Sequence, residues 1–326
     1  MIEEILPDFY RIEVPLPENP LKLLNSYLIK GKNRNLLIDT GFNRKECKTA
    51  LMDGLNTLEV NLEETDIFIT HLHADHSGLI SAVATNNTVV YCSEVDSKIV
   101  NLTHMPNYWA EIRSLFKSHG FPFQIIDETG WRHPGQIYNP DCEQSFTFVK
   151  ENDSIEIGNY HFLCIETPGH TPGHICLYEP IQKLLISGDH ILAKITPNIG
   201  LEKFIDDPLD LYLKSLEKID QMEINLALPG HRQIIVDVHK RIGELQQHHT
   251  NRLKEILKIL NTNRMNAYQI ASKMKWDLTY TEWEKFPISQ KWFAAGEAAT
   301  HLIYLWQKGM IHGINEDGIF FFERIT

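Results

Sequence analysis

The sequence predicts an α+β protein in which helices cover β-sheets, followed by a smaller helical unit at the C-terminus. Short β-branched and apolar runs alternate with charged, helix-favouring segments over the first two thirds of the chain. A long amphipathic helix with further helical segments then follows. Such a strand-first layout is typical of sheets packed against helices. With 326 residues and 43% hydrophobic side chains, the chain corresponds to roughly two domains of about 150 residues.

The N-terminal strands are indicated by short apolar runs between turn residues. Segments 9–14, 26–29 and 35–38 are separated by Pro15, Pro17 and Gly31, which predicts an antiparallel meander. A helix is expected over 43–55 and a strand over 66–70. Further strands are expected at 88–92, 160–166, 174–178, 183–187 and 226–228.

Residues 101–142 differ in composition from the segments around them. Aromatic side chains alternate there with Pro and Gly, and the set comprises Tyr108, Trp109, Phe116, Phe121, Phe123 and Trp131. We interpret this segment as a lid-like insertion, helical or irregular in structure, whose residues contact a substrate. Ordinary surface packing is the alternative interpretation.

The C-terminal part shows a different periodicity. From Asp237 onward, apolar residues recur at spacings of three and four, which predicts one long amphipathic helix; its stripe is Ile242, Leu245, His249, Leu253, Ile256 and Leu260. Helices are expected at 267–274 and 294–307, and a hairpin at 310–322 around Asp317-Gly318. Three helices and a hairpin describe a winged helix. The predicted boundaries are 1–236 for a catalytic domain and 237–326 for the linking helix and winged-helix domain.

Composition excludes several classes of protein. The formal net charge of −12 argues against general affinity for nucleic acid or anionic membranes. No run of about eighteen apolar residues is present, and the acidic N-terminus lacks the features of a signal peptide. The five cysteines are scattered without a C-x-x-C pair, which is typical of reduced thiols and predicts a cytoplasmic protein without a thiolate metal site.

The strongest chemical signal follows the strand expected at 66–70. His71, His73, Asp75 and His76 form an H-x-H-x-D-H run, for which random placement of these residue types gives about 0.002 occurrences. Imidazole and carboxylate groups suit Zn²⁺ and similar divalent ions. Six residues cannot complete two coordination shells, so further ligands are expected in turns at other strand ends.

Three such turns exist. His170 lies in a Pro/Gly loop between two expected strands, Asp189 directly follows a strand in Ser187-Gly188-Asp189, and His231 follows Leu228-Pro229-Gly230. Each residue alone is a weak signal, because a His or Asp beside Gly is common. The order and spacing of all of them together are much more specific.

These motifs resemble those of the metallo-β-lactamase superfamily, specifically its glyoxalase II-like hydrolases. The resemblance rests on Asp39-Thr40-Gly41, the H-x-H-x-D-H run, His170, Asp189 and His231. It implies a four-layer αβ/βα sandwich over about residues 8–236 and two divalent metal ions. One ion would be held by His71, His73 and His170, and the other by Asp75, His76 and His231, with Asp189 bridging them. Asp39 would orient a ligand histidine. The ligand set is compatible with zinc, our first expectation, and with iron or manganese.

The tail resembles a winged-helix domain found in some of these hydrolases, on the basis of His248-His249-x-x-Arg252 and the closing hairpin. His248 and Arg252 either reach the mouth of the active site or join the two domains. His174, His190 and His249 are expected to be packing residues. One departure is Leu79, which stands where many relatives carry a second glycine, and it removes no ligand.

The resemblance implies a hydrolase in which a metal-bridging hydroxide, oriented by the catalytic Asp75, attacks the substrate. Our first hypothesis is a small-molecule thioester, ester or lactone as substrate. The second is a phosphodiester, as in an endoribonuclease, against which the charge of −14 on residues 1–250 counts. A third is a non-catalytic metal sensor that binds nucleic acid, but the tail carries a charge of only +2. The tail is therefore expected to be a packing or homodimerisation module.

Overall fold

A seven-stranded sheet is built from the first part of the chain, in the strand order β1-β2-β3-β4-β5-β6-β7. Neighbouring strands are antiparallel as far as β4 and parallel from β4 to β7. The strands are β1 (Ile2–Leu6), β2 (Phe9–Pro15), β3 (Leu23–Lys30), β4 (Asn35–Ile38), β5 (Thr65–Phe68), β6 (Val90–Ser93) and β7 (Thr147–Val149).

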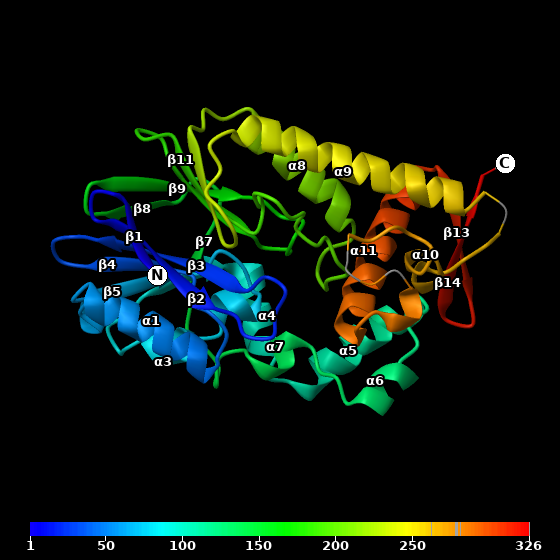
Figure 1. The fold of residues 1–326 in the computed structure, drawn as a ribbon, viewed down its shortest axis with the longest axis horizontal. Coiled ribbons are helices and arrows are strands. Elements are labelled where there is room, and N and C mark those ends of the chain that lie inside the picture. Colours follow the sequence, from blue (N-terminus) through cyan, green and yellow to red (C-terminus); the bar gives the residue numbers. More distant parts are fainter. Residues whose placement is uncertain (262, 278–279, 281, 326) are drawn as a thin grey trace.

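This computed structural model describes residues 1–261, 263–277, 280 and 282–325 (Figure 1). The undescribed positions lie within the predicted C-terminal unit.

A second sheet of five strands packs against the first, in the order β12-β11-β10-β9-β8. Its pairs are antiparallel except for β11 and β12, which run parallel. The strands are β8 (Ser154–Ile157), β9 (Tyr160–Glu166), β10 (Ile175–Glu179), β11 (Leu184–Gly188) and β12 (Leu226–Pro229). Apolar side chains from both sheets, including Phe9, Tyr27 and Phe162, form one buried cluster between them.

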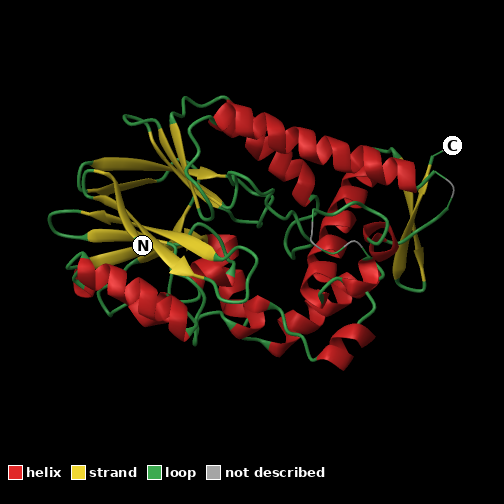
Figure 2. Ribbon diagram, in the orientation of Figure 1, coloured by secondary structure: helices red, strands yellow, loops and turns green. Residues whose placement is uncertain are grey.

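Helices cover the outer face of each sheet, giving four layers (Figure 2). On the first sheet, the apolar faces of α1 (Lys45–Thr57) and α3 (Ile80–Val83) pack against strand residues such as Leu28 and Ile67. On the second sheet, α8 (Pro208–Asp220) and the first part of α9 (Val238–Ile259) pack against residues such as Leu185. The predicted arrangement of sheets covered by helices is therefore confirmed.

The segment between β6 and β7 is mainly helical. It contains α4 (Glu94–Leu102), α5 (Pro106–Ser118), α6 (Gln124–Thr129) and α7 (Pro134–Ile137). Pro106 and Pro134 each occupy the first turn of a helix, where the missing N–H costs nothing. The residues from 101 to 142 thus form short helices rather than an irregular loop.

The C-terminal unit follows α9 and consists of α10 (Ala267–Ala271), α11 (Ile288–Gln307), β13 (Ile311–Glu316) and β14 (Ile319–Arg324). Asp317 and Gly318 join the two strands, and both have positive φ, as a two-residue hairpin turn requires. The unit lies at one end of the molecule, with α9 running along it (Figure 1). None of the helices in the described residues is long and apolar enough to cross a membrane.

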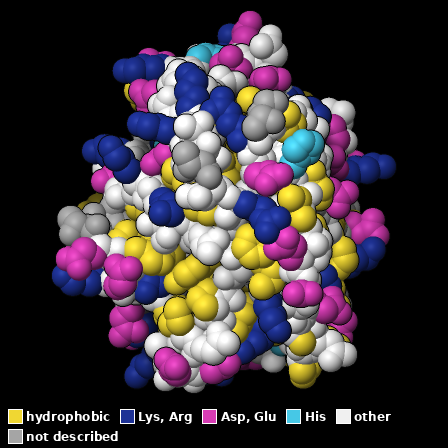
Figure 3. Space-filling view, turned by 90° about the vertical axis from the view of Figure 1, so that its right-hand side faces the viewer, with side chains coloured by type: hydrophobic (Ala, Val, Ile, Leu, Met, Phe, Trp, Pro, Cys, Tyr) yellow, Lys and Arg dark blue, Asp and Glu magenta, His cyan; other side chains and the backbone are white. Residues whose placement is uncertain are grey.

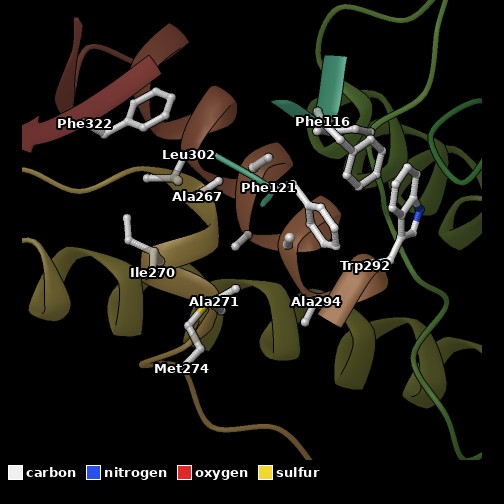
Figure 4. Packing of buried hydrophobic residues seen from close by; sticks show 14 of the residues in the cluster. Phe116, Phe121, Ala267, Ile270, Ala271, Met274, Trp292, Ala294, Leu302 and Phe322 are labelled. Atoms are coloured by element: carbon white, nitrogen blue, oxygen red, sulfur yellow. The ribbon is translucent and has the colours of Figure 1, made fainter. Parts of the chain in front are cut away.

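One hydrophobic cluster joins this unit to the segment between β6 and β7. Phe116 from α5 stacks on Trp292 from α11 with 3.7 Å between ring centroids, and Phe121 packs edge-on against the same indole. Figure 4 shows these rings beside Ala294, with Leu302 and Phe322 in the same cluster. The segment and the unit therefore share a core.

Most expected elements lie within a few residues of the observed ones. The helix expected at 294–307 begins earlier, at Ile288, and the helix expected at 267–274 ends at Ala271. The elements that were not expected from the sequence include β1, β7, β8, α2, α3, α4 and α8.

Candidate metal centre

The H-x-H-x-D-H run spans the turn after β5 and the helix α2 (Ala74–Ser77). His73 is extended (φ −60°, ψ 143°) and is the N-cap residue of the helix, and Asp75 and His76 lie within the helix. The four side chains therefore converge on one edge of the sheets, where His71 Nε2 lies 3.1 Å from His73 Nδ1.

The other predicted residues reach the same place from the second sheet. His170 follows β9, Asp189 follows β11 and His231 follows β12. Two glycines allow the close approach: a Cβ on Gly188, which has a φ of +46°, would lie 2.8 Å from His174 Nε2, and one on Gly230 would lie 2.6 Å from His76 Cε1. Neither position can accept a side chain without movement of these neighbours.

The seven side chains form three overlapping groups in which all potential ligand atoms lie within 4.8 Å of one another. The groups are His71, His73 and His170; His71, His76 and Asp189; and Asp75, His76 and His231. Asp189 lies between the first and third groups, because its carboxylate is 3.7 Å from His170 Nε2 and 3.5 Å from both His76 Nε2 and His231 Nε2. The structure thus brings together every ligand residue that the sequence predicted.

Among the described residues, four of the facing atoms are buried and have no hydrogen-bond partner: His76 Nε2, His170 Nε2, His231 Nε2 and Asp189 Oδ1. Buried polar atoms in native proteins are nearly always satisfied by protein, water or an ion. Nitrogen and carboxylate oxygen donors without a thiolate suit divalent ions such as zinc, iron or manganese. The donor set therefore fits divalent metal binding.

The other ring nitrogen of most of these histidines is held by the protein. His76 Nδ1 lies 2.7 Å from Asp39 Oδ2, whose carboxylate also accepts from the Thr70 N–H and hydroxyl. His170 Nδ1 donates to the Asn198 carbonyl at 2.8 Å, and His231 Nδ1 to that of Leu23 at 2.7 Å. Such contacts fix ring orientation.

Charges within the cluster shift the protonation of its members. Burial alone lowers the pKa of a histidine, but the Asp189 and Asp75 carboxylates outweigh burial at His231 and raise its pKa to about 9. Burial alone raises the pKa of a carboxyl group, yet contact with His231 and the nearby His76 lowers the pKa of Asp75 to about 2. The carboxylate of Asp75 is therefore ionised at neutral pH and can accept hydrogen bonds or bind a cation.

Three polar residues around the cluster were not predicted. Glu202 Oε1 lies 3.7 Å from His73 Nε2, Asn198 accepts from His170, and Asp96 binds both ligand-bearing loops through Leu72, Thr171 and Gly173. No sequence motif marks them, because each stands alone in the chain and becomes adjacent to the site only after folding.

The remaining histidines are placed outside the cluster. His174 accepts from the Asp189 N–H at 3.2 Å, and its other nitrogen lies 2.8 Å from Thr167 Oγ1. His190 is buried beside Tyr212, and His249 pairs with His301 at 3.0 Å. All three expected packing residues are therefore buried, and none of them belongs to the three groups of ligand atoms.

A cavity of about 580 Å³ opens onto this cluster. Its polar end includes His73, Asp75, His170 and Asp189. Its other walls come from α5, residues 131–139, residues 192–202 and one face of α11; the apolar lining includes Tyr108, Trp109, Ile112, Phe116, Trp131, Trp292 and Phe293. The C-terminal unit therefore forms part of the cavity wall.

Comparison with known proteins identifies the family. The model of the metallo-beta-lactamase superfamily matches residues 22–231. The chain belongs to this superfamily. The "Probable metallo-hydrolase YqjP" of Bacillus subtilis (strain 168) is 28% identical over 278 residues, covering 82% of this chain and 85% of that protein. The acyl-coenzyme A thioesterase MBLAC2 of Homo sapiens is 22% identical over 213 residues, covering 64% and 72%.

A solved structure extends the similarity to the whole chain. The crystal structure of a metallo-beta-lactamase family protein from Thermus thermophilus has a TM-score of 0.82 and 26% identity. The match covers 99% of this chain and 100% of that one. The C-terminal unit is therefore included in the shared architecture.

Proposed function

We propose that this protein is a glyoxalase II-like, dinuclear metal-dependent hydrolase of small-molecule thioesters, esters or lactones with an apolar acyl group. The observation that carries the proposal is the single cavity that joins the histidine and aspartate cluster to a wall of aromatic side chains. Ligand pockets are commonly apolar with a few convergent polar groups. A polar reaction centre at one end and an apolar chamber at the other suit an ester with a hydrophobic acyl chain.

The ligand assignment follows the groups of adjacent atoms. We assign one ion to His71, His73 and His170, the other to Asp75, His76 and His231, and the bridging position to Asp189. Zinc is our first expectation, since imidazole and carboxylate are common zinc ligands. When bound, such ions activate water and polarise the substrate carbonyl.

The residues of the chain supply orientation and shielding. Asp75 lines the cavity, and its ionised carboxylate can accept a hydrogen bond from the attacking water and so direct the water at the carbonyl carbon. Asp39 holds the His76 ring through Nδ1. The aromatic wall excludes bulk water from the acyl chain. Burial of the acyl chain contributes roughly 25 cal/mol of binding free energy per Å² of apolar surface.

Charge and similarity support a small acyl substrate. Apart from the proposed ligands, the charged groups in the described cavity lining are Glu18, Glu202 and Arg132, so this lining offers no cluster of basic side chains for a polyanionic substrate. The human relative is named as an acyl-coenzyme A thioesterase. On the face formed by the C-terminal unit, Lys and Arg side chains are interspersed with Asp and Glu side chains (Figure 3). Such a mixed surface does not favour nucleic-acid binding.

We further propose that residues 1–236 form the catalytic domain and 237–326 the linking helix and a winged-helix domain. Within the first of these, we propose that 101–142 serve as a lid over the acyl chamber. The order of three helices and a hairpin in the second supports this assignment.

The test is a substrate panel with defined metals. Wild-type protein loaded with zinc, iron or manganese is assayed with acyl thioesters, lactones, a phosphodiester and single-stranded RNA, and bound metal is counted. We expect two ions per chain and turnover of the acyl substrates. His71→Ala should lose metal and turnover, whereas His161→Ala, on the exposed side of β9, should keep both. Cleavage of RNA alone, or less than one ion per wild-type chain, would contradict the proposal.

A further inference from the structure

The ligand histidine His170 is linked to the C-terminal unit through one loop. His170 Nδ1 donates to the backbone carbonyl of Asn198 at 2.8 Å. Asn198 belongs to residues 192–202, which line the cavity and which we call the 192–202 loop. The same loop contributes Glu202 beside His73. Two residues of one proposed ligand group therefore depend on where this loop lies.

The C-terminal helices hold the backbone of the 192–202 loop at several points. Arg241 of α9 donates from Nε to the Leu192 carbonyl at 2.7 Å and from Nη2 to that of Ile195 at 3.0 Å. Thr300 of α11 donates to the Ile199 carbonyl at 2.6 Å. Because three carbonyls are fixed by side chains of α9 and α11, the position of the loop follows that of the two helices.

The Asn198 side chain contacts α11 at two groups. Its Nδ2 donates to the Phe293 carbonyl at 3.4 Å and to Glu297 Oε2 at 3.3 Å. Glu297 is a buried carboxylate, 8% exposed. Its Oε1 faces Arg252 Nε at 3.4 Å and His248 Nε2 at 3.9 Å. Neither Arg252 nor His248 lines the cavity in the described residues, and Glu297 links both of them to Asn198.

We infer that Glu297 is a positioning residue that orients the metal ligand His170 through Asn198. A ligand histidine binds well only when its second nitrogen meets a fixed acceptor, and such outer contacts typically change metal affinity about 10- to 100-fold. The acceptor here is a loop carbonyl, and the Asn198 side chain ties that residue to a carboxylate on α11. The inference rests on the proposed function, because it requires His170 to bind a metal ion.

The experiment measures zinc affinity in Glu297→Ala, Asn198→Ala and the double variant, by competition with a chromophoric chelator. Asn198→Ala keeps the carbonyl that His170 uses and removes the side-chain contacts with Glu297 and with the Phe293 carbonyl. In each single variant we expect one of the two ions to bind about 10- to 100-fold more weakly, while the affinity for the other ion stays unchanged. The double variant should bind no more weakly than the weaker single variant, because both changes break one link.

Two further variants separate positioning from structure. Glu297→Gln retains an oxygen that can accept from Asn198, so its affinity should return to within a few-fold of wild type. Leu302→Ala removes a buried side chain of the same helix and should lower the melting temperature while leaving both zinc affinities unchanged.

The outcomes are distinguishable. Unchanged affinities in both Asn198→Ala and Glu297→Ala would overturn the inference while leaving the proposed function intact. Equal weakening of both ions in Glu297→Ala and Leu302→Ala would overturn it in favour of a general structural effect. Wild-type protein that binds no metal would overturn the proposed function and the inference together. If Glu297→Ala does not fold, Asn198→Ala still decides the question.

Discussion

The hydroxyl of Thr171 donates to the Asp96 carboxylate at 2.6 Å. The same carboxylate accepts from the Leu72 N–H at 2.9 Å and from the Gly173 N–H at 2.7 Å. Leu72 lies between two of the proposed ligands, and Thr171 follows a third. Asp96, which is fully buried in α4, therefore connects the two loops that carry one ligand group.

Replacement of Asp96 by alanine should weaken both the fold and the metal site. Three buried donors would lose their acceptor, which we expect to lower the free energy of unfolding by about 3 kcal/mol. Urea unfolding of the metal-free protein measures this loss, and chelator competition measures the weaker binding of one ion. Glu94→Ala, at an exposed position of the same helix, is the control and should stay within about 0.5 kcal/mol of wild type. An unchanged unfolding midpoint in Asp96→Ala would contradict this account.

Glu202 should set the orientation of His73. Glu202→Gln removes the negative charge opposite His73 Nε2, so we expect zinc affinity for one ion to fall about tenfold. Isothermal titration of metal-free protein with zinc would record the change. Glu217→Gln, on the exposed face of α8, provides the matched control. Identical titrations for the Glu202 and Glu217 variants would argue against a role for Glu202.

In the proposed function, Phe293 should favour medium-chain acyl thioesters over acetyl thioesters as substrates. Its half-buried ring lines the cavity from α11, and loss of such a ring removes about 1.5–3 kcal/mol of apolar contact. In Phe293→Ala we expect the KM for a medium-chain acyl thioester to rise about tenfold or more, with little change for an acetyl thioester. Phe148→Ala changes an exposed ring on β7 and should alter neither. Equal effects of Phe293→Ala on both chain lengths would refute the assignment of this wall to the acyl group.

His119 should make the interface between α5 and the hairpin sensitive to acid. Its buried ring stacks on Phe320 and Phe322, and burial lowers the pKa of His119 to about 4. In the unfolded chain the pKa is about 6.5. As pH falls from about 6.5 to 4, only the unfolded state takes up the proton, so the free energy of unfolding decreases.

His119→Phe removes this proton uptake. The free energy of unfolding of the variant minus that of wild type should be about 2 kcal/mol larger at about pH 5 than at about pH 7.5. Denaturant unfolding of the variant and of wild type at the two pH values measures these free energies. The control is Met310→Leu at an exposed position without a titratable group, where the difference should not change with pH. A pH-independent difference for His119→Phe would show that the ring is not held in its neutral form.

The sequence predicted the elements whose signals are local. Strands 35–38 and 160–166 were predicted with their observed bounds, because apolar runs and turn residues mark them. β7 was missed because it has only three residues, two of which are exposed, so its pairing depends on β6 rather than on its own pattern. α8 carried a usable signal in Asp207 as its cap and Pro208 in its first turn, but hydrophobic periodicity alone did not reveal the helix.

The residues of the site also differ in whether local sequence signals predict them. The proposed ligand residues could be predicted because four of them lie within six positions of the chain and the others lie beside glycines at strand ends. Asp96, Asn198 and Glu297 could not, because they are separated from their partners by 75, 28 and 99 residues. Such contacts form only through tertiary packing, so they cannot be predicted from a single sequence.

The cluster of apolar side chains shared by α5 and α11 has a consequence for how such a protein can change. Because Trp292 and Phe293 belong to the C-terminal unit and also line the cavity, removal of that unit would expose Phe116 to water and open the cavity. A chain without the C-terminal unit would therefore lack part of its cavity wall. Conversely, substitutions on the cavity-facing side of α11 can alter the size and shape of the cavity while every proposed ligand residue stays the same. New substrate preferences can therefore arise in the tail without a change in the reaction centre.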